Sequence, residues 1–210
     1  MKMTKAFAVV IIGCMLVGAC ATRTELRAAR PAPAGIDLTG TPQAVTDVEG
    51  VEKRLFRDGR VWIGGQPNVA ALERLKGLGV TAVVNLRTPR ETTNREQVPF
   101  DEPAEVSRLG MEYINIPIGG TEYPFGPEAV QRFAEVLQRH DGQVFLHCAS
   151  GVRVSYLWVA YLVRFGGLEL HSALARGRAI GIGPDPLEQL LGRPLTLTWA
   201  DAVESAGGGR

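Results

Sequence analysis

The chain has 210 residues, of which 45% are hydrophobic and 21% are charged, and its formal net charge is +1. This length suits one domain with accessory segments or at most two small domains, and the hydrophobic fraction is too high for a disordered chain. The near-neutral charge argues against nucleic acid as a partner, because no long-range attraction would hold it. Any anion must then be bound by a local site.

The first residues have the pattern of a secretory signal peptide. Lys2 and Lys5 precede the apolar segment 6–19, which is shorter than the ~20 residues that a membrane-spanning helix needs. The motif LVGAC ends at Cys20 and resembles the lipobox of bacterial lipoproteins, in which an acylated cysteine follows small residues. The resemblance implies a lipid on Cys20 and an extracytoplasmic protein of the bacterial cell envelope, anchored to a membrane. The alternative is ordinary signal cleavage nearby.

Composition then divides the rest of the chain. We predict a signal peptide over residues 1–19, a flexible tether over 20–47, a single folded domain over 48–195 and a C-terminal tail over 196–210. The tether is rich in Ala, Pro, Gly and Thr and has no sustained hydrophobic period.

Cysteine usage points to one functional thiol. Cys14 would leave with the signal peptide and Cys20 would carry lipid, so Cys148 is the thiol that we expect in the folded domain. A disulfide within the domain is then impossible. A lone thiol in an oxidising compartment is a liability unless it is buried or useful.

Strand and helix patterns alternate along the predicted domain. Apolar runs predict strands at 60–65, 80–86, 111–118 and 143–148, and helical patterns predict helices at 68–79, 127–141, 152–165, 169–180 and 185–192. Asn68 is a plausible N-cap, and the helix at 152–165 is apolar nearly all round, which indicates a buried position. The alternation predicts an α/β fold with a mostly parallel central sheet flanked by helices. Ligands of such sheets bind at the carboxyl ends of the strands, where Cys148 lies.

The segment after the last strand has the chemistry of an anion site. The N–H groups of a strand–loop–helix turn converge, and the helix dipole favours negative charge at that point. Four residues with small side chains let the backbone wrap closely around an anion: Ala149, Ser150, Gly151 and Val152. Arg153 adds a planar fork suited to two oxygens of an oxyanion. The same features would stabilise a Cys148 thiolate and bind an anionic substrate beside it.

Four motifs in order carry a family resemblance. They are GGQP at 64–67, VVNLRTPRE at 83–91, YINIPI at 113–118 and HCASGVRVSYLW at 147–158. The chain from about Leu55 to Ile180 resembles the β-lactamase-hydrolase-like branch of the cysteine-dependent phosphatases, which have a three-layer, dual-specificity-phosphatase-like fold. The resemblance implies that Cys148 is the nucleophile, that Arg153 clamps the oxyanion, and that the loop N–H groups cradle phosphate. It implies no cofactor.

Two departures from the common phosphatase pattern leave the chemistry open. Four residues separate Cys148 from Arg153, where five are usual, and this shorter spacing also resembles the rhodanese loop, whose cysteine carries a persulfide. The usual aspartate that protonates the leaving group is missing from the segment 119–128. Glu122 is the only carboxylate before the helix there, so it is either the general acid or a solvated loop residue.

Other residues have weaker signals. His147 would orient the loop, as its counterpart does in the family, or is a structural histidine, and Ser155 would support the thiolate. Arg87 and Glu91 line the pocket rim or form a surface ion pair.

We expect no metal site, because His140 and His171 are far apart and have no ligand-spaced partners. The sequence therefore leaves three hypotheses: a phosphatase acting through phosphocysteine, a sulfurtransferase using a Cys148 persulfide, and a non-catalytic module that binds an anion or a phosphoprotein. No protein partner can be named.

Overall fold

The computed structural model describes residue 36, residues 38–182 and residues 187–195. The predicted signal peptide, Cys14, Cys20 and the predicted C-terminal tail lie outside them. In chain order the elements are β1 (Gln43–Val45), β2 (Leu55–Asp58), β3 (Val61–Gly64), α1 (Val69–Gly77), β4 (Val80–Asn85), α2 (Pro89–Thr92), α3 (Glu102–Arg108), β5 (Glu112–Asn115), α4 (Pro127–Arg139), β6 (Gln143–His147), α5 (Val152–Arg164), α6 (Leu170–Ala179) and α7 (Leu187–Leu191). No helix among the described residues is long and apolar enough to cross a membrane.

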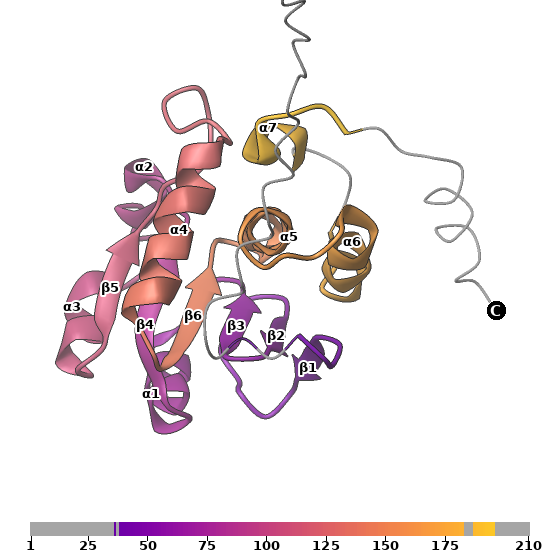
Figure 1. The fold of residues 1–210 in the computed structure, drawn as a ribbon. Coiled ribbons are helices and arrows are strands. Elements are labelled where there is room, and N and C mark those ends of the chain that lie inside the picture. Colours follow the sequence, from indigo (N-terminus) through magenta and orange to yellow (C-terminus); the bar gives the residue numbers. More distant parts are fainter. Residues whose placement is uncertain (1–35, 37, 183–186, 196–210) are drawn as a thin grey trace, which may run out of the picture.

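The strands form one twisted sheet in the order β1-β2-β3-β6-β4-β5 (Figure 1). The strands β3, β6, β4 and β5 run parallel, and β1 and β2 form an antiparallel edge. This confirms the predicted α/β class with a mostly parallel sheet. Because β6 lies between β3 and β4, it is an inner strand of the sheet. Cys148 directly follows its carboxyl end, at the end of the parallel strands where ligands bind.

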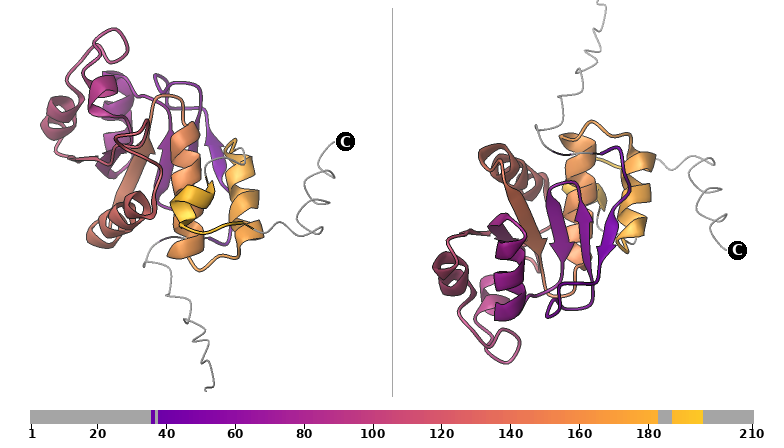
Figure 2. Two further views of the ribbon diagram at one scale, coloured as in Figure 1. Left: turned by 90° about the horizontal axis from the view of Figure 1, so that it is seen from above. Right: turned by 90° about the horizontal axis from the view of Figure 1, so that it is seen from below.

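Helices cover both faces of the sheet, so the fold has three layers (Figure 2). On one face α4 to α7 pack over a core that includes Phe133, Trp158 and Tyr161. On the other face α1 and α3 pack over a smaller core that includes Leu72 and Val106. Every residue of α5 from 154 to 162 is buried, which confirms that this helix is central.

Local signals explain where α1 begins and ends. The Asn68 side chain accepts a hydrogen bond of 2.8 Å from the Ala71 N–H, as an N-cap does. Leu72 and Leu75 are fully buried on the inner face. The chain then turns through Gly79 at φ +93°, a conformation that favours glycine.

The folded body begins earlier than the predicted domain boundary. The strand β1 lies inside the range 20–47 that the sequence assigned to a tether, and it pairs with β2 at the sheet edge. The Arg176 guanidinium also donates to the backbone carbonyls of Leu38 and Gly40, and bonds the buried Asp58 carboxylate at 2.5 Å. A three-residue edge strand with two exposed side chains has no hydrophobic pattern, so composition could not reveal it.

Candidate active site

Cys148 follows β6 directly and is 1% exposed. Its sulfur accepts a hydrogen bond of 3.2 Å from the Gly151 N–H. Gly151 caps α5 at φ +89°, in the left-handed region where a side chain is strained. The amino end of α5 therefore presents an N–H group to the sulfur, and this arrangement favours negative charge there.

The Arg153 guanidinium is anchored by the protein. Its Nη1 and Nη2 atoms donate to the two oxygens of the Glu91 carboxylate at 2.8 and 2.5 Å, and Nη1 also donates to the Ile118 carbonyl at 2.7 Å. Burial lowers the pKa of Arg153, but hydrogen bonding and charge from Glu91 and from Cys148 outweigh it and raise the pKa. Arg153 thus stays cationic and is held by Glu91.

Glu91 is held in turn by the start of α2. The Thr88 N–H and hydroxyl donate to its carboxylate at 2.9 and 3.0 Å, which completes a capping box. Burial raises the pKa of Glu91, but the hydrogen bonds from Arg153 and Thr88 outweigh it and lower the pKa to about 2. Glu91 is therefore ionised at neutral pH. The pair seen here was not expected from the sequence, which placed Glu91 at the rim or in a surface pair with Arg87.

The Arg87 side chain lies inside the protein. It is 2% exposed, so its interpretation as a surface ion-pair residue is wrong. Its guanidinium donates to Gln66 at 2.9 Å and to Gln97 at 2.5 Å, and its Nε lies 4.0 Å from the Glu91 carboxylate. The motifs GGQP and VVNLRTPRE, distant in sequence, meet through these contacts.

Sequence reasoning missed a buried acid behind the loop. Glu102 in α3 is 2% exposed, and its Oε1 lies 2.8 Å from Nε2 of His147. Its Oε2 accepts from Gln66 at 3.2 Å and from Asn85 at 3.0 Å. Nothing in the pattern of 102–108 distinguishes Glu102 from the partly exposed Glu105, because only long-range packing buries Glu102.

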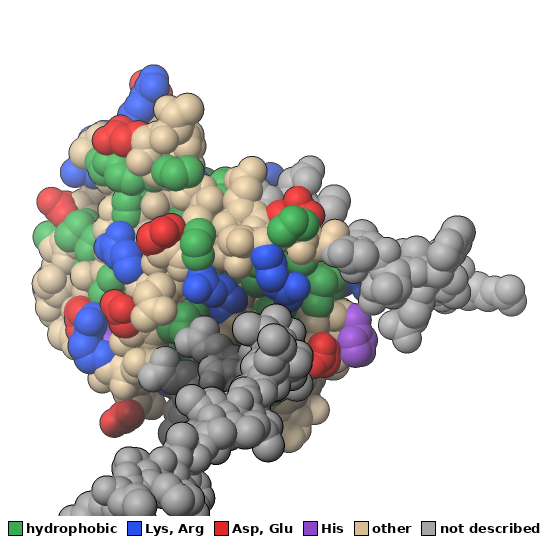
Figure 3. All heavy atoms as spheres, turned by 45° about the horizontal axis from the view of Figure 1, so that its top comes forward, with side chains coloured by type: hydrophobic (Ala, Val, Ile, Leu, Met, Phe, Trp, Pro, Cys, Tyr) green, Lys and Arg blue, Asp and Glu red, His purple; other side chains and the backbone are tan. Residues whose placement is uncertain are grey.

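An open pocket of about 630 Å³ lies beside Arg153. Its walls are residues 88–91 at the start of α2 and the turn 119–123, which the Gly119 N–H closes by donating to the Tyr123 carbonyl at 2.6 Å. Glu122 stands in this wall with an exposed side chain, so the turn brings it to the pocket that contains Arg153. The same end of the molecule presents interspersed acidic and basic side chains (Figure 3).

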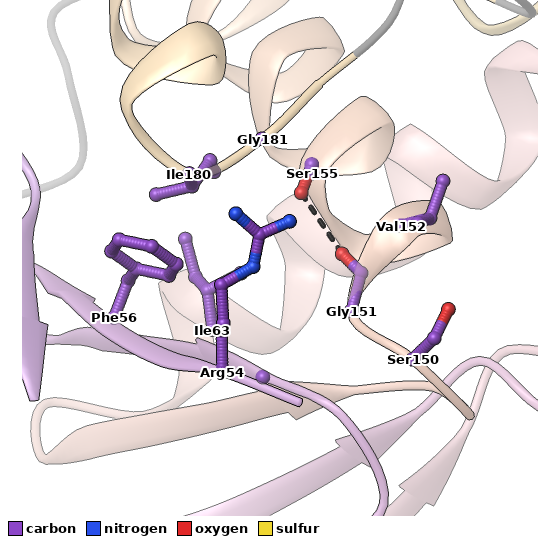
Figure 4. Close-up of a pocket in the computed structure, with 10 residues that line it drawn as sticks. Arg54, Phe56, Ile63, Ser150, Gly151, Val152, Ser155, Ile180 and Gly181 are labelled. Carbon is purple, nitrogen blue, oxygen red and sulfur yellow. Dashed lines mark hydrogen bonds between the residues drawn. The ribbon is translucent and has the colours of Figure 1, made fainter. Parts of the chain in front are cut away.

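A much smaller cavity, of about 10 Å³, lies on the other side of the loop. It is lined by Ser150, Gly151, Val152 and Ser155, and the Arg54 guanidinium points toward it (Figure 4). The Ser155 hydroxyl donates to the Gly151 carbonyl at 2.9 Å. Ser155 thus holds the backbone of the loop at Gly151. Through this bond Ser155 acts on the Cys148 sulfur indirectly, because the Gly151 N–H donates to that sulfur.

No three His, Cys, Asp or Glu side chains within the described ranges gather closely enough to hold a metal ion. The Cys148 sulfur faces the Gly151 N–H, and the Arg153 guanidinium with its Glu91 partner lies in the first turn of the same helix. Such a set suits an anion.

Comparison with known families agrees with this geometry. The family model for a DSP-PTPase phosphatase fused to NAD+ kinase matches residues 42–172. The chain belongs to this phosphatase family. Over 146 residues it is 27% identical to the beta-lactamase hydrolase-like protein of Xylella fastidiosa. These aligned residues are 70% of this chain and 32% of that relative. The relative of the same name from Agrobacterium fabrum is 31% identical to this chain over 101 residues. These aligned residues are 48% of this chain and 22% of that relative. The chain thus spans a third or less of these curated relatives.

Solved phosphatase structures share the fold. The DUF442 protein of Shewanella putrefaciens CN-32 superposes with a TM-score of 0.53 at 24% identity, over 78% of this chain and 97% of that one. The active form of Tk-PTP superposes with a TM-score of 0.51 at 28% sequence identity, and the match covers 65% of this chain and 95% of that chain. Pseudomonas aeruginosa TpbA, in complex with pTyr, superposes with a TM-score of 0.51 at 18% sequence identity, and the match covers 81% of this chain and 90% of that chain.

Proposed function

We propose that the chain is a cysteine-dependent phosphatase that hydrolyses phosphomonoesters through a phosphocysteine intermediate. The observation that carries this proposal is that the Cys148 sulfur accepts a hydrogen bond of 3.2 Å from the Gly151 N–H at the amino end of α5, where Glu91 anchors Arg153. Glu91 accepts from Nη1 and Nη2, and the Ile118 carbonyl also accepts from Nη1, so the Nε–H and the second N–H of Nη2 would face the oxygens of a bound phosphoryl group. The family and the fold agree with the proposal.

In the proposed reaction the Cys148 thiolate attacks phosphorus, and the bond from phosphorus to the ester oxygen breaks. Arg153 and the loop N–H groups stabilise the charge that gathers on the phosphoryl oxygens. Glu122 protonates the departing oxygen and then accepts a proton from the water that attacks phosphocysteine. Inorganic phosphate leaves, and the thiolate is regenerated.

For the substrate we propose an aryl phosphate such as phosphotyrosine. The pocket of about 630 Å³ beside Arg153 is open and has room for an aromatic ring, and Tyr123 stands in its wall. TpbA, which shares the fold, was crystallised with pTyr. Both observations support the class of substrate rather than a particular protein.

A second candidate is sulfur transfer through a Cys148 persulfide. One observation favours it: four residues separate Cys148 from Arg153, which is the rhodanese spacing. Sulfur transfer between thiolates also needs no proton donor at the position of Glu122. The third hypothesis, a module that binds an anion without catalysis, requires only the loop N–H groups and Arg153.

Replacing Glu122 by glutamine is expected to slow hydrolysis according to the leaving group. Turnover of an alkyl phosphate, which needs a proton, should fall by about 10²-fold, and turnover of p-nitrophenyl phosphate should change much less. Glu128→Gln is the matched control, since Glu128 is exposed in the first turn of α4 and outside the pocket lining. Equal losses on both substrates would show that Glu122 is not the acid.

For localisation we propose the bacterial cell envelope, with a lipid on Cys20 as the anchor. The support is the segment from Lys2 to Cys20, with its charged start, short apolar run and lipobox-like end. Cys20→Ala is expected to move the protein from the membrane fraction to the soluble fraction of cells and to abolish labelling by radioactive palmitate. Cys14→Ala is the control and should leave both unchanged. Palmitate labelling that persists in Cys20→Ala would refute the anchor.

A further inference from the structure

A short turn before β2 is bonded to the end of β3 and, through it, to the anion loop. Within this turn, residues 52–54, the Arg54 N–H donates to the Glu52 carbonyl at 2.8 Å, and the Glu52 N–H donates to the Gln66 carbonyl at 2.9 Å. The Gln66 N–H donates in turn to the Ala149 carbonyl of the loop at 3.1 Å. We call residues 52–54 the basic turn, since two of the three are cationic.

Gly65 lets the basic turn and the loop approach each other closely. A Cβ atom at this position would collide with the Glu52 carbonyl oxygen and would come within 3.0 Å of the Ala149 carbonyl oxygen. Only glycine therefore fits between the two segments. The basic turn is thus held at a fixed place beside the loop.

The backbone of Lys53 is strained. Its φ is +66°, and among the residues that the structure describes it is the one non-glycine residue with a positive φ. A glycine would adopt this conformation without strain, and a lysine does not. Backbone strain of this kind clusters at sites where binding uses it, so the lysine calls for a reason beyond the fold.

The two cationic side chains of the basic turn are free to bind. Lys53 and Arg54 are exposed, and neither side chain forms a hydrogen bond or an ion pair with another residue of the described ranges. Glu52 is also exposed and forms no salt bridge with either of them. The turn therefore presents two unpaired cations and one carboxylate to solvent.

The Arg54 guanidinium has a defined place next to the loop. A Cβ atom at Gly181 would lie 2.6 Å from its Nη2, so the missing side chain at Gly181 makes room for it. The guanidinium points toward Gly151 and Ser155 at the start of α5 (Figure 4). It is the one charged group that lines the cavity of about 10 Å³ there. This cavity holds roughly one water molecule, so a larger anion would bind at the exposed face of the guanidinium.

The sheet order places the basic turn opposite the pocket beside Arg153. The strand β6, which leads to Cys148, lies between β3 and β4. The basic turn is bonded to the end of β3, whereas the wall 88–91 of the pocket follows β4. A peptide that carries phosphotyrosine continues on both sides of the aromatic residue and advances ~3.3 Å per residue when extended. Residues near the phosphotyrosine would therefore reach the basic turn across the loop.

We propose that Lys53 and Arg54 form a second anion subsite, which binds an acidic side chain close to the phosphotyrosine of the substrate and so contributes to its selection. A carboxylate pairs with both kinds of cation. Both residues lie outside the four motifs that carry the family resemblance. The inference rests on the proposed function in taking a phosphotyrosine protein as the substrate.

The test compares kcat/KM of the purified full chain on three phosphotyrosine peptides. One has two aspartates directly before the phosphotyrosine, one has two directly after it, and one has alanines at all four positions. At low salt we expect the wild type to prefer at least one acidic peptide over the alanine peptide by about two- to fivefold. The preference should disappear in about 0.5 M NaCl, because salt screens exposed charges.

The double variant Lys53→Ala, Arg54→Ala should lose this preference and keep the wild-type rate on p-nitrophenyl phosphate, which has no flanking residues. Arg57→Ala is the matched control. Arg57 is exposed in β2, lies 5.3 Å from the centroid of the Trp62 ring and lines neither of the cavities beside the loop. It should keep the preference. A preference that persists in the double variant, or an equal loss on p-nitrophenyl phosphate, would overturn the proposal.

Lys53→Gly separates binding from folding. Because glycine tolerates φ +66°, the melting temperature should not fall, while the preference for the acidic peptide should weaken. Arg54→Glu should reverse the preference, so that a peptide with two lysines in place of the aspartates becomes the better substrate. A purely structural role of the turn predicts neither result, and an unchanged preference in both variants would contradict the subsite.

Binding tests the subsite without turnover. Dissociation constants of the same three peptides are measured with Cys148→Ser, in which the basic turn is intact. Tighter binding of an acidic peptide at low salt would support the subsite even if the wild type releases no phosphate, which would refute only the proposed function. Equal dissociation constants for all three peptides would overturn the inference.

Discussion

Replacing Cys148 by serine is expected to abolish phosphate release, with a fall in kcat on the order of 10⁴-fold or more. The serine hydroxyl has nearly the same shape but stays protonated at neutral pH, so the nucleophile is lost. The hydrogen bond of 3.2 Å from Gly151 that faces the sulfur would face a neutral oxygen instead. The measurement is release of inorganic phosphate from an aryl phosphate by the full chain.

The same variant separates the three hypotheses. Binding of inorganic phosphate should persist in Cys148→Ser, because the loop N–H groups and Arg153 remain. Phosphate release unchanged from the wild type would contradict the phosphocysteine mechanism. Transfer of sulfur from thiosulfate to cyanide, together with a persulfide mass on Cys148 in the wild type, would support the sulfurtransferase instead. Binding with neither activity would support the module that only binds.

Replacing Arg153 by lysine is expected to lower kcat/KM for the same substrate by about 10²- to 10³-fold. An ammonium keeps the charge but cannot bond the Glu91 carboxylate with two parallel N–H groups while also facing Cys148 and the substrate. The anchor formed by the bonds of 2.8 and 2.5 Å to Glu91 would be lost. The loss should be larger in kcat than in KM, because the clamp acts most strongly on the transition state.

Arg164→Lys controls for arginine loss in the same helix. Arg164 is exposed in the last turn of α5, where it donates to the Pro127 carbonyl at 2.9 Å. The kcat/KM of the Arg164→Lys variant should equal that of the wild type. If Arg153→Lys also retains full activity, Arg153 does not clamp the substrate, and the proposed mechanism is wrong.

Sequence patterns predicted the parts of the fold that local physics governs. The buried strands β4 and β6 are apolar runs, and α4 and α5 follow from helical patterns with Pro127 and Gly151 at their starts. The elements that sequence reasoning missed, β1, β2, α2 and α3, are short and carry little or no such pattern. Backbone pairing to β2 makes β1 a strand, and the side-chain pattern of its three residues does not record that pairing.

The candidate site divides in the same way. The residues from His147 to Ser155 are consecutive, so their strand, loop and helix bring Cys148 and the loop N–H groups together without help from the rest of the chain. The partners of these residues come from elsewhere. Glu91 holds Arg153 from α2, and Glu102 contacts His147 from α3.

The class of fold could be predicted from the sequence, and so could the candidate thiol Cys148 and the candidate anion loop after it, because hydrophobic period, spacing and side-chain chemistry are local properties. Only the tertiary structure decided which carboxylates face Arg153 and His147, and that Arg87 is buried. The reason is physical: a charged side chain enters the interior only when partners from other elements satisfy it, and no local pattern records those partners.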